Sequence, residues 1–363
     1  MASPEANIRI GYVPEHYLTP LHLALKSAIS SLPFKVTIKP FPSGTGHMIT
    51  SLRENEIDIG IGLTEGWVAG LVGKTQLERG DVDGGYKMVG QWVETPLRWA
   101  IVTGRNRNDI NSVNDLKGSR VGVSRLGSGS HIMSFVLSQQ QSWPSVSSPL
   151  TPVILGPFPS LRDGVTGLSP ASQGTSPSAP SADFFMWEEF TTKPFFHPSE
   201  SSPSPQLKKI GEIFTPWPSW HIAASTSTFP SPAQDVRLSQ LFEALDSGIA
   251  AFEADREHVV RLLGTGDLGC KYNDADAREW LKDVRFVKGG TRGVDNSVVD
   301  EVINILKVGE VFYPHGLNPT CVTLHFPWNC LLLACMVSFF LEPLAIIFSR
   351  IAFQGCRKNK HGK

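Results

Sequence analysis

Residues 57–71, IDIGIGLTEGWVAGL, decide the fold class of this chain. Residues 57–63 are a short, apolar and β-branched run of strand length, and Thr64-Glu65-Gly66 directly after it opens a helix. The same order occurs upstream, where the strand-like run 8–13 precedes leucine and isoleucine at helical spacing over 19–29. Strands that alternate with helices predict an α/β fold, with mixed, mostly parallel sheets that are covered by helices.

The alternation continues through the rest of the body. Further strands are predicted at 34–39, 97–103, 120–124, 153–155, 183–187 and 221–225, and further helices at 48–52, 109–117, 131–139, 236–252, 255–263, 275–282 and 296–308. We therefore expect residues 7–95 and 216–317 to form one lobe, into which a second lobe of residues 96–215 is inserted. Residues 164–181 are rich in Ser, Pro and Gly without an apolar period, which predicts a flexible surface insertion in the second lobe.

Composition argues against several classes of protein. The formal net charge is −1, so no overall field attracts nucleic acid or an anionic membrane. The N-terminus lacks the basic and apolar regions of a secretory signal. Cys270 is alone in the body and the other cysteines follow residue 320, so neither a disulfide framework nor a zinc-ligand spacing is expected. These features predict a cytoplasmic protein with no nucleic-acid partner and no metal site.

The tail, residues 318–363, differs in kind from the body. Residues 330–348, CLLLACMVSFFLEPLAIIF, have about the length of a membrane span and are followed by a basic end. Glu342 and Pro343 interrupt the span, and an unpaired carboxylate inside a bilayer is costly. Three interpretations stay open: a membrane anchor, an amphiphilic segment packed on the protein, and an artefact of the gene model.

Candidate binding loops follow the predicted strands. In open α/β sheets, ligands bind at the carboxyl ends of strands, where helix N-termini favour anions and polar oxygens. This rule selects residues 14–16, 43–46, 64–66, Arg125 with 127–131, and 187–188. Each loop alone could be a plain turn with a helix cap, but their shared place at strand ends favours a binding site.

The residue types in these loops indicate a ligand with polar edges. Arg125 can clamp a carboxylate or phosphate with two hydrogen bonds, whereas Glu15, Glu65 and Glu188 favour amine or hydroxyl donors, including a cation. Each carboxylate could instead neutralise a helix N-terminus or pair with an arginine. Tryptophans could stack on a planar ring or box a cation, or serve in the core and hinge: Trp187, Trp217 and Trp220.

Catalysis has little support in the sequence. Four histidines of the body are scattered singly: His16, His47, His131 and His221. The loop 127–130, GSGS, lacks the further residues of a dinucleotide fingerprint or a P-loop, and there is no nucleophile elbow and no zinc-protease motif. No catalytic residue, metal ligand or cofactor is therefore expected.

Six blocks of sequence, in order, resemble a group of fungal and bacterial proteins with the type II periplasmic-binding-protein fold. The blocks are VPEHYLTPL (13–21), PSGTG (42–46), ENEIDIGIGLTEGWVAGL (54–71), VGVSRLGSGSHIMSFVL (121–137), FFMWEEFTTKPF (184–195) and GEIFTPWPSW (211–220). The group is related to the substrate-binding components of ABC importers and, more distantly, to the pyrimidine synthases of thiamine biosynthesis.

The resemblance implies two α/β lobes of the Venus-flytrap type, two crossover segments that act as a hinge, and a ligand held between the lobes. Carried over residue by residue, it implies a cleft lined by Glu15, His16, Thr45, Gly46, Thr64, Glu65, Arg125, Ser128, Ser130, Trp187, Glu188 and Trp217.

The function it implies is non-catalytic binding of a small polar or heteroaromatic solute, over which the lobes close. Two alternatives stay open. One is an enzyme related to the pyridoxal-phosphate- and iron-dependent synthases, although their cysteine-rich iron motif is absent and only Lys193 suggests itself for a Schiff base. The other is a membrane-tethered transport or sensing accessory, which requires membrane contact through residues 330–348. The sequence leaves the oligomeric state open.

Overall fold

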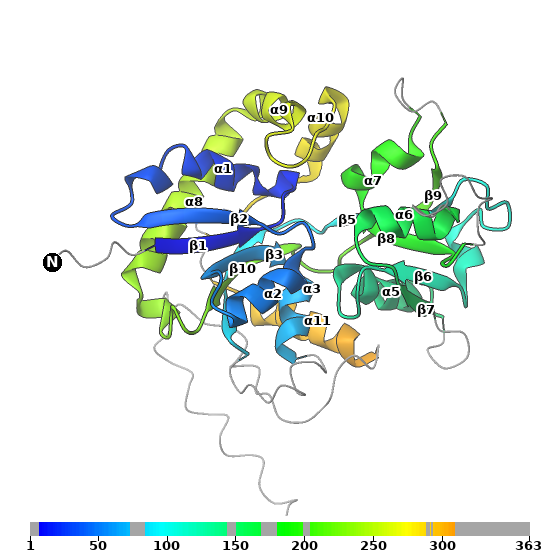
Figure 1. Cartoon of the computed structure of the whole chain (residues 1–363), viewed down its shortest axis with the longest axis horizontal. Coiled ribbons are helices and arrows are strands. Elements are labelled where there is room, and N and C mark those ends of the chain that lie inside the picture. The colour runs from blue at the N-terminus through cyan, green and yellow to red at the C-terminus, as the bar shows by residue number, and fades with distance from the viewer. Residues whose placement is uncertain are drawn as a thin grey trace, which may run out of the picture. The chain divides into compact units, whose positions relative to one another are not determined.

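Two five-stranded sheets organise the described part of the chain (Figure 1). The structure is a computed structural model that describes residues 7–72, 84–143, 150–167, 180–198, 204–287, 291 and 293–308. All of these residues belong to one compact unit. The first lobe is built on one sheet and the second lobe on the other.

The sheet of the first lobe has the strand order β2-β1-β3-β10-β4. Its strands are β1 (Asn7–Tyr12), β2 (Lys35–Pro40), β3 (Ile59–Leu63), β4 (Tyr86–Val93) and β10 (Trp220–Ser225). β1 pairs in parallel with β2 and β3, and β10 runs antiparallel between β3 and β4. The carboxyl ends of β1, β2 and β3 and the amino end of β10 therefore lie at the same edge.

Helices cover both sides of this sheet, with α1 and α8 on one side and α2, α3 and α11 on the other (Figure 1). The helices of the first lobe are α1 (Thr19–Leu25), α2 (Thr45–Arg53), α3 (Thr64–Val72), α8 (Val236–Ala254), α9 (Arg256–Thr265), α10 (Asp274–Asp283) and α11 (Asn296–Val308), with 3-10 turns η1 (His16–Leu18), η2 (Ile29–Ser31) and η5 (Pro232–Gln234). Helices α8, α9 and α10 begin at Asp235, Asp255 and Asn273, whose side chains accept backbone N–H groups of the first turn.

The sheet of the second lobe has the order β7-β6-β8-β5-β9. Its strands are β5 (Arg98–Gly104), β6 (Arg120–Val123), β7 (Thr151–Ile154), β8 (Phe184–Glu188) and β9 (Leu207–Phe214), and its helices are η3 (Val113–Leu116), α5 (Gly129–Gln140), α6 (Phe158–Thr166) and α7 (Glu189–Phe196). β6 pairs in parallel with β7 and β8, and β5 runs antiparallel between β8 and β9. This arrangement repeats that of the first sheet.

The chain passes between the sheets through residues 94–97 and again through 215–219. The two crossings are hydrogen-bonded to each other. The Leu97 N–H donates to Thr215 Oγ1 at 2.9 Å, and the Thr215 N–H donates to the Leu97 carbonyl at 3.0 Å. Ser219 bonds the Thr95 carbonyl through its hydroxyl group at 2.7 Å. The crossings thus form a paired connection between the lobes.

The structure confirms the predicted α/β fold class, but fewer of the strand pairings are parallel than expected. Each sheet holds two parallel and two antiparallel pairings among the described strands. The prediction missed β4 and β9, which pair at sheet edges, and the amphipathic α6 and α7. The residue limits predicted for the lobes stay a prediction, although β4, β5, β9 and β10 fall in the lobes that those limits assign to them.

Two local predictions are corrected by the structure. The helix predicted at 109–117 is only the 3-10 turn η3, because a capping box between Ser112 and Asp115 closes a single short turn there. Residues 164–166, predicted to belong to a flexible insertion, instead complete α6, and Val165 is fully buried. Residues 168–179 lie outside the described residues.

The hydrophobic tail also lies outside the described residues, together with its segment 330–348. Among the helices that the structure describes, none is long and apolar enough to cross a bilayer. The membrane anchor stays a prediction.

Asp58, directly before β3, joins three segments of the first lobe. Its carboxylate accepts the Arg9 backbone N–H at 2.8 Å, the Arg9 guanidinium at 2.8 Å and the Thr228 hydroxyl at 2.7 Å. Burial alone would raise the pKa of Asp58, but the hydrogen bonds from Arg9 and Thr228 outweigh it and lower the pKa. The group therefore stabilises the folded state above the ordinary pKa of an aspartate and ceases to do so on acidification.

We expect Asp58→Ala to lower the free energy of unfolding by about 2 kcal/mol at pH 7, because hydrogen bonds to a charged group are lost. The loss should shrink below pH ~4 as the wild-type carboxylate protonates. Urea titrations at pH 7 and pH 3.5 measure both effects, with Asp267→Ala on an exposed loop as control. An unchanged stability at pH 7 would contradict the role assigned to Asp58.

Candidate functional site

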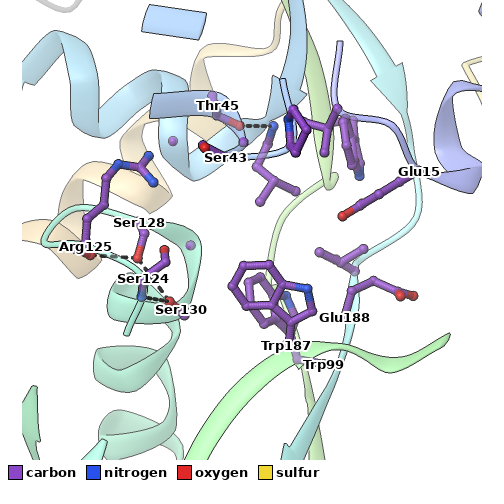
Figure 2. A pocket seen from close by; sticks show the side chains of 18 residues that line it. Glu15, Ser43, Thr45, Trp99, Ser124, Arg125, Ser128, Ser130, Trp187 and Glu188 are labelled. Carbon is purple, nitrogen blue, oxygen red and sulfur yellow. Dashed lines mark hydrogen bonds between the residues drawn. The ribbon is translucent and has the colours of Figure 1, made fainter. Parts of the chain in front are cut away.

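A pocket with a volume of about 70 Å³ lies between the two lobes (Figure 2). Its walls come from the segments after β1, β2 and β6, the ends of β3 and β8, the first turns of α3 and α5, and the beginnings of β5 and β10. These are the carboxyl ends of parallel strands, joined by the amino ends of the antiparallel strands.

The structure brings seven of the predicted site residues to the pocket wall: Glu15, Thr45, Arg125, Ser128, Ser130, Trp187 and Glu188. The remaining predicted residues lie behind the wall or beside it: His16, Gly46, Thr64, Glu65 and Trp217. Sequence reasoning missed Trp99, the second residue of β5, because the rule of strand ends considers parallel strands only. Trp220, which begins β10, was considered as a ring that could stack on a ligand, but it was not among the residues predicted to line the cleft.

One end of the pocket is basic. The Arg125 guanidinium reaches from the second lobe to the first turn of α2 and lies against Gly46, where a Cβ atom would be only 2.0 Å from Arg125 Nη2. Among the described residues it has neither an ion-pair nor a hydrogen-bond partner. Burial lowers the pKa of Arg125, but an arginine stays charged at any physiological pH. A positive charge thus faces the pocket without a counter-ion in the described part of the chain.

Two helices begin at the same end. Helix α2 starts after Gly44, which has a φ of 77° and offers no capping side chain, and α5 starts after Ser128, whose hydroxyl accepts the His131 N–H at 3.4 Å. The Ser128 hydroxyl also donates to the Arg125 carbonyl at 2.7 Å and lies 3.0 Å from Ser130 Oγ. The N-terminal ends of both helices carry partial positive charge, which adds to that of Arg125.

The opposite end of the pocket is acidic (Figure 2). Glu188 Oε2 accepts the Thr191 N–H at 2.6 Å, and Glu188 Oε1 lies 3.4 Å from Nε2 of the buried His16. His16 Nδ1 in turn lies 2.8 Å from the Tyr272 hydroxyl. Burial alone would raise the pKa of Glu188, but His16 and the backbone N–H of Thr191 outweigh it and lower the pKa. Glu188 is therefore ionised at neutral pH.

Glu15 behaves in the opposite way. The carboxyl group of Glu15 lines the pocket and is surrounded by protein, and this burial, together with the negative charge of Glu188, raises its pKa to about 8. Glu15 is then mostly protonated at neutral pH. Two carboxyl groups at one end thus carry different charges, because only Glu188 has His16 and a backbone N–H as partners.

Tryptophan side chains form the apolar walls between the two ends. The rings of Trp99 and Trp187 meet edge to face, with centroids 6.5 Å apart. Nε1 of Trp99 and Nε1 of Trp220 are buried and have no hydrogen-bond partner among the described residues. Such buried donors are uncommon in native proteins, and here both line the pocket.

Thr64, Glu65 and Trp217 lie in the protein core rather than on the pocket surface. Thr64 Oγ1 lies 2.8 Å from His221 Nδ1, and Glu65 Oε2 accepts the Trp217 indole N–H at 3.0 Å. Glu65 is fully buried, and its other oxygen Oε1 has no hydrogen-bond partner among the described residues. The close packing of β3, β10 and the second crossing turns these polar side chains inward, which the sequence pattern does not reveal.

Among the described residues, no group of His, Cys, Asp and Glu is arranged to hold a metal ion. Cys270 is partly buried, and burial raises the pKa of its thiol to about 12.

Comparison with known proteins identifies the family. Residues 99–213 match a family model described as Ca3427-like periplasmic binding proteins. The structure is similar to that of the CA3427 gene product of Candida albicans, with a TM-score of 0.70 and 30% sequence identity over 86% of this chain and 92% of that chain. The chain belongs to this Ca3427-like family. Its members exhibit the generic periplasmic binding protein fold, in agreement with the resemblance found in the sequence.

More distant structures share the fold. The alkanesulfonate-binding protein SsuA of Xanthomonas axonopodis pv. citri, solved with bound MOPS, is 17% identical over 88% of this chain and 99% of that chain, with a TM-score of 0.64. The aliphatic sulphonate binding protein SsuA of Escherichia coli is 16% identical over 86% and 95%, with a TM-score of 0.59. No curated protein matches this Ca3427-like chain.

The pKa of Glu65 tests whether this side chain is buried in the core behind the pocket. Burial raises the pKa of Glu65 to about 7, and the hydrogen bond from Trp217 offsets only part of that effect. Because the folded state then holds a proton that the unfolded state releases near pH 4.5, the stability of the wild type falls as the pH rises toward 7.

We expect the stability of Glu65→Gln relative to wild type to increase by about 2 kcal/mol from pH 5 to pH 8, since glutamine does not titrate. Chemical unfolding at both pH values measures it. Glu301→Gln, on an exposed position of α11, should show no such change. A pH-independent difference for Glu65→Gln would rule out a raised pKa.

Proposed function

We propose that this protein binds a small solute through an anionic group, in the pocket between its lobes, and performs no chemical step on it. The observation that carries the proposal is the Arg125 guanidinium, which faces the pocket with no partner among the described residues. A buried or half-buried charge without a counter-ion is costly, so such a group is usually matched by a ligand.

The surroundings of Arg125 support an anion rather than a neutral group. The first turns of α2 and α5 add their positive ends at the same place, and Ser43 and Ser128 add hydroxyl groups. The tryptophan walls favour an apolar or flat body behind the anionic head. SsuA of Xanthomonas, which has the same fold, was solved with the sulfonate MOPS, and sulfonates are therefore suitable probes.

The alternative enzyme related to thiamine-pyrimidine synthases is not favoured. Burial alone would lower the pKa of Lys193, but ion pairs with Asp276 at 2.5 Å and Glu279 at 2.8 Å outweigh it and raise the pKa. An amine that stays protonated is a poor nucleophile for a Schiff base. Lys193 is also not among the residues that line the pocket.

We expect Arg125→Gln to weaken the binding of ethanesulfonate or propionate by about 10- to 100-fold, because a charge-assisted hydrogen bond is lost. Titration calorimetry of the full chain at pH 7 measures it. Gly46→Ala should weaken binding as well, since the added Cβ atom displaces the guanidinium. Arg261→Gln, on an exposed position of α9, is the control.

Failure of the wild type to bind either anion would overturn the proposed function. Equal affinity of the wild type and Arg125→Gln would show that the anion binds at another site, and the role assigned to Arg125 would then be wrong.

We also propose that the two lobes reside in the cytoplasm, because Cys270 is the only cysteine before residue 320 and no disulfide framework is expected there. A tagged full-length protein should then appear in the soluble fraction of a cell lysate, as should a version that ends at residue 317. Recovery of only the full-length protein with membranes would instead support the anchor.

A further inference from the structure

The pocket has two ends of opposite chemical character, and the proposed function uses only one of them. Figure 2 shows Arg125 and Ser43 on one side and Glu15 and Glu188 on the other, with Trp99 and Trp187 beside the space between. The carboxyl group of Glu15 points into that space. A ligand that is only an anion would leave this second end without a partner.

An open carboxyl group in the wall indicates that the acidic end also takes a ligand group. The Glu15 side chain is half-buried, lines the pocket, and its carboxyl group has no hydrogen-bond partner among the described residues. Glu188 Oε1 is shielded from the pocket and lies 3.4 Å from His16 Nε2, so Glu188 contributes its charge from behind Glu15. Carboxyl groups in protein interiors normally form hydrogen bonds, so a donor from a ligand fits beside Glu15.

We infer that the solute is a zwitterion, with its anionic group at Arg125 and a protonated amine at Glu15. The inference rests on the proposed function and adds the second charge. An ammonium group supplies up to three N–H donors, which suits a carboxyl group that has a further negative charge, that of Glu188, behind it.

Charge balance at the acidic end makes binding depend on pH. The titratable groups that face Glu15 are Tyr17 from η1, Glu188 from β8, and Cys270 and Tyr272 from the segment between α9 and α10. Burial raises the pKa of both tyrosines and of the thiol, so these three groups are neutral. Among the groups described, only Glu188, with His16 behind it, therefore acts on Glu15 as a charge.

An ammonium group beside Glu15 favours the ionised form of this carboxyl group. Because Glu15 holds a proton with a pKa of about 8 in the free protein, binding of the amine at neutral pH should expel that proton to solvent. The affinity for an amine-bearing ligand then rises with pH up to about 8, while that for a plain anion does not.

The test compares two pairs of probes that differ by one amino group: taurine with ethanesulfonate, and β-alanine with propionate. Titration calorimetry of the full chain is run between pH 6 and pH 8, in buffers of different ionisation enthalpy. We expect the amine member of at least one pair to bind about tenfold tighter or more at pH 8. Its affinity should fall about tenfold or more toward pH 6, and close to one proton should be released at pH 7.

Glu15→Gln should reduce the gap within the pair to less than about threefold and abolish proton release. Glu54→Gln, at the exposed end of α2, is the matched control and should change neither quantity. The wild-type pH series decides the matter by itself if Glu15→Gln fails to fold.

If both anions bind and the amino group brings no gain and no proton release, the zwitterion is excluded and the proposed function stands. If neither member of either pair binds, both the proposed function and this inference are overturned.

Discussion

The hydrogen-bonded pair of crossings is the constraint on which the rest of the structure depends. Leu97 and Thr215 exchange hydrogen bonds at 2.9 and 3.0 Å, so the chain leaves and re-enters the first lobe at one place. Trp99 and Trp220 lie just beyond the two crossings and contribute to the pocket. Because β5 and β10 begin there, the parallel strands of both sheets present their carboxyl ends to the same space.

Burial determines the charge of the groups around this space. The same low-dielectric surroundings act on Glu15 and Glu188, yet only Glu188 keeps a lowered pKa, because His16 and the Thr191 N–H stabilise its anion. Arg125 lacks such a partner in the described part of the chain. An unpaired buried charge destabilises a protein, so the position of Arg125 at the pocket supports the proposed binding of an anion.

Much of the fold and part of the site could be predicted from local sequence. The β-branched run before Thr64 and the turn before Thr45 reveal a strand followed by a helix, and this alternation indicates an α/β protein. Loops after parallel strands supplied Glu15, Arg125 and Trp187, because the carboxyl ends of such strands bind ligands in open sheets. Trp99 was missed, since it lies near the start of an antiparallel strand whose direction local patterns do not show.

The sequence by itself determined most of the strands and helices, the class of fold and the loops that carry polar residues, because side-chain periodicity and turn chemistry act over a few neighbouring residues. Only the tertiary structure decided that Thr64 and Glu65 turn into the core and that Arg125 rests on Gly46. It also decided that the charge of Glu188, from the other lobe, acts on Glu15. These outcomes depend on packing and electrostatics between residues far apart in the chain, which no local pattern encodes.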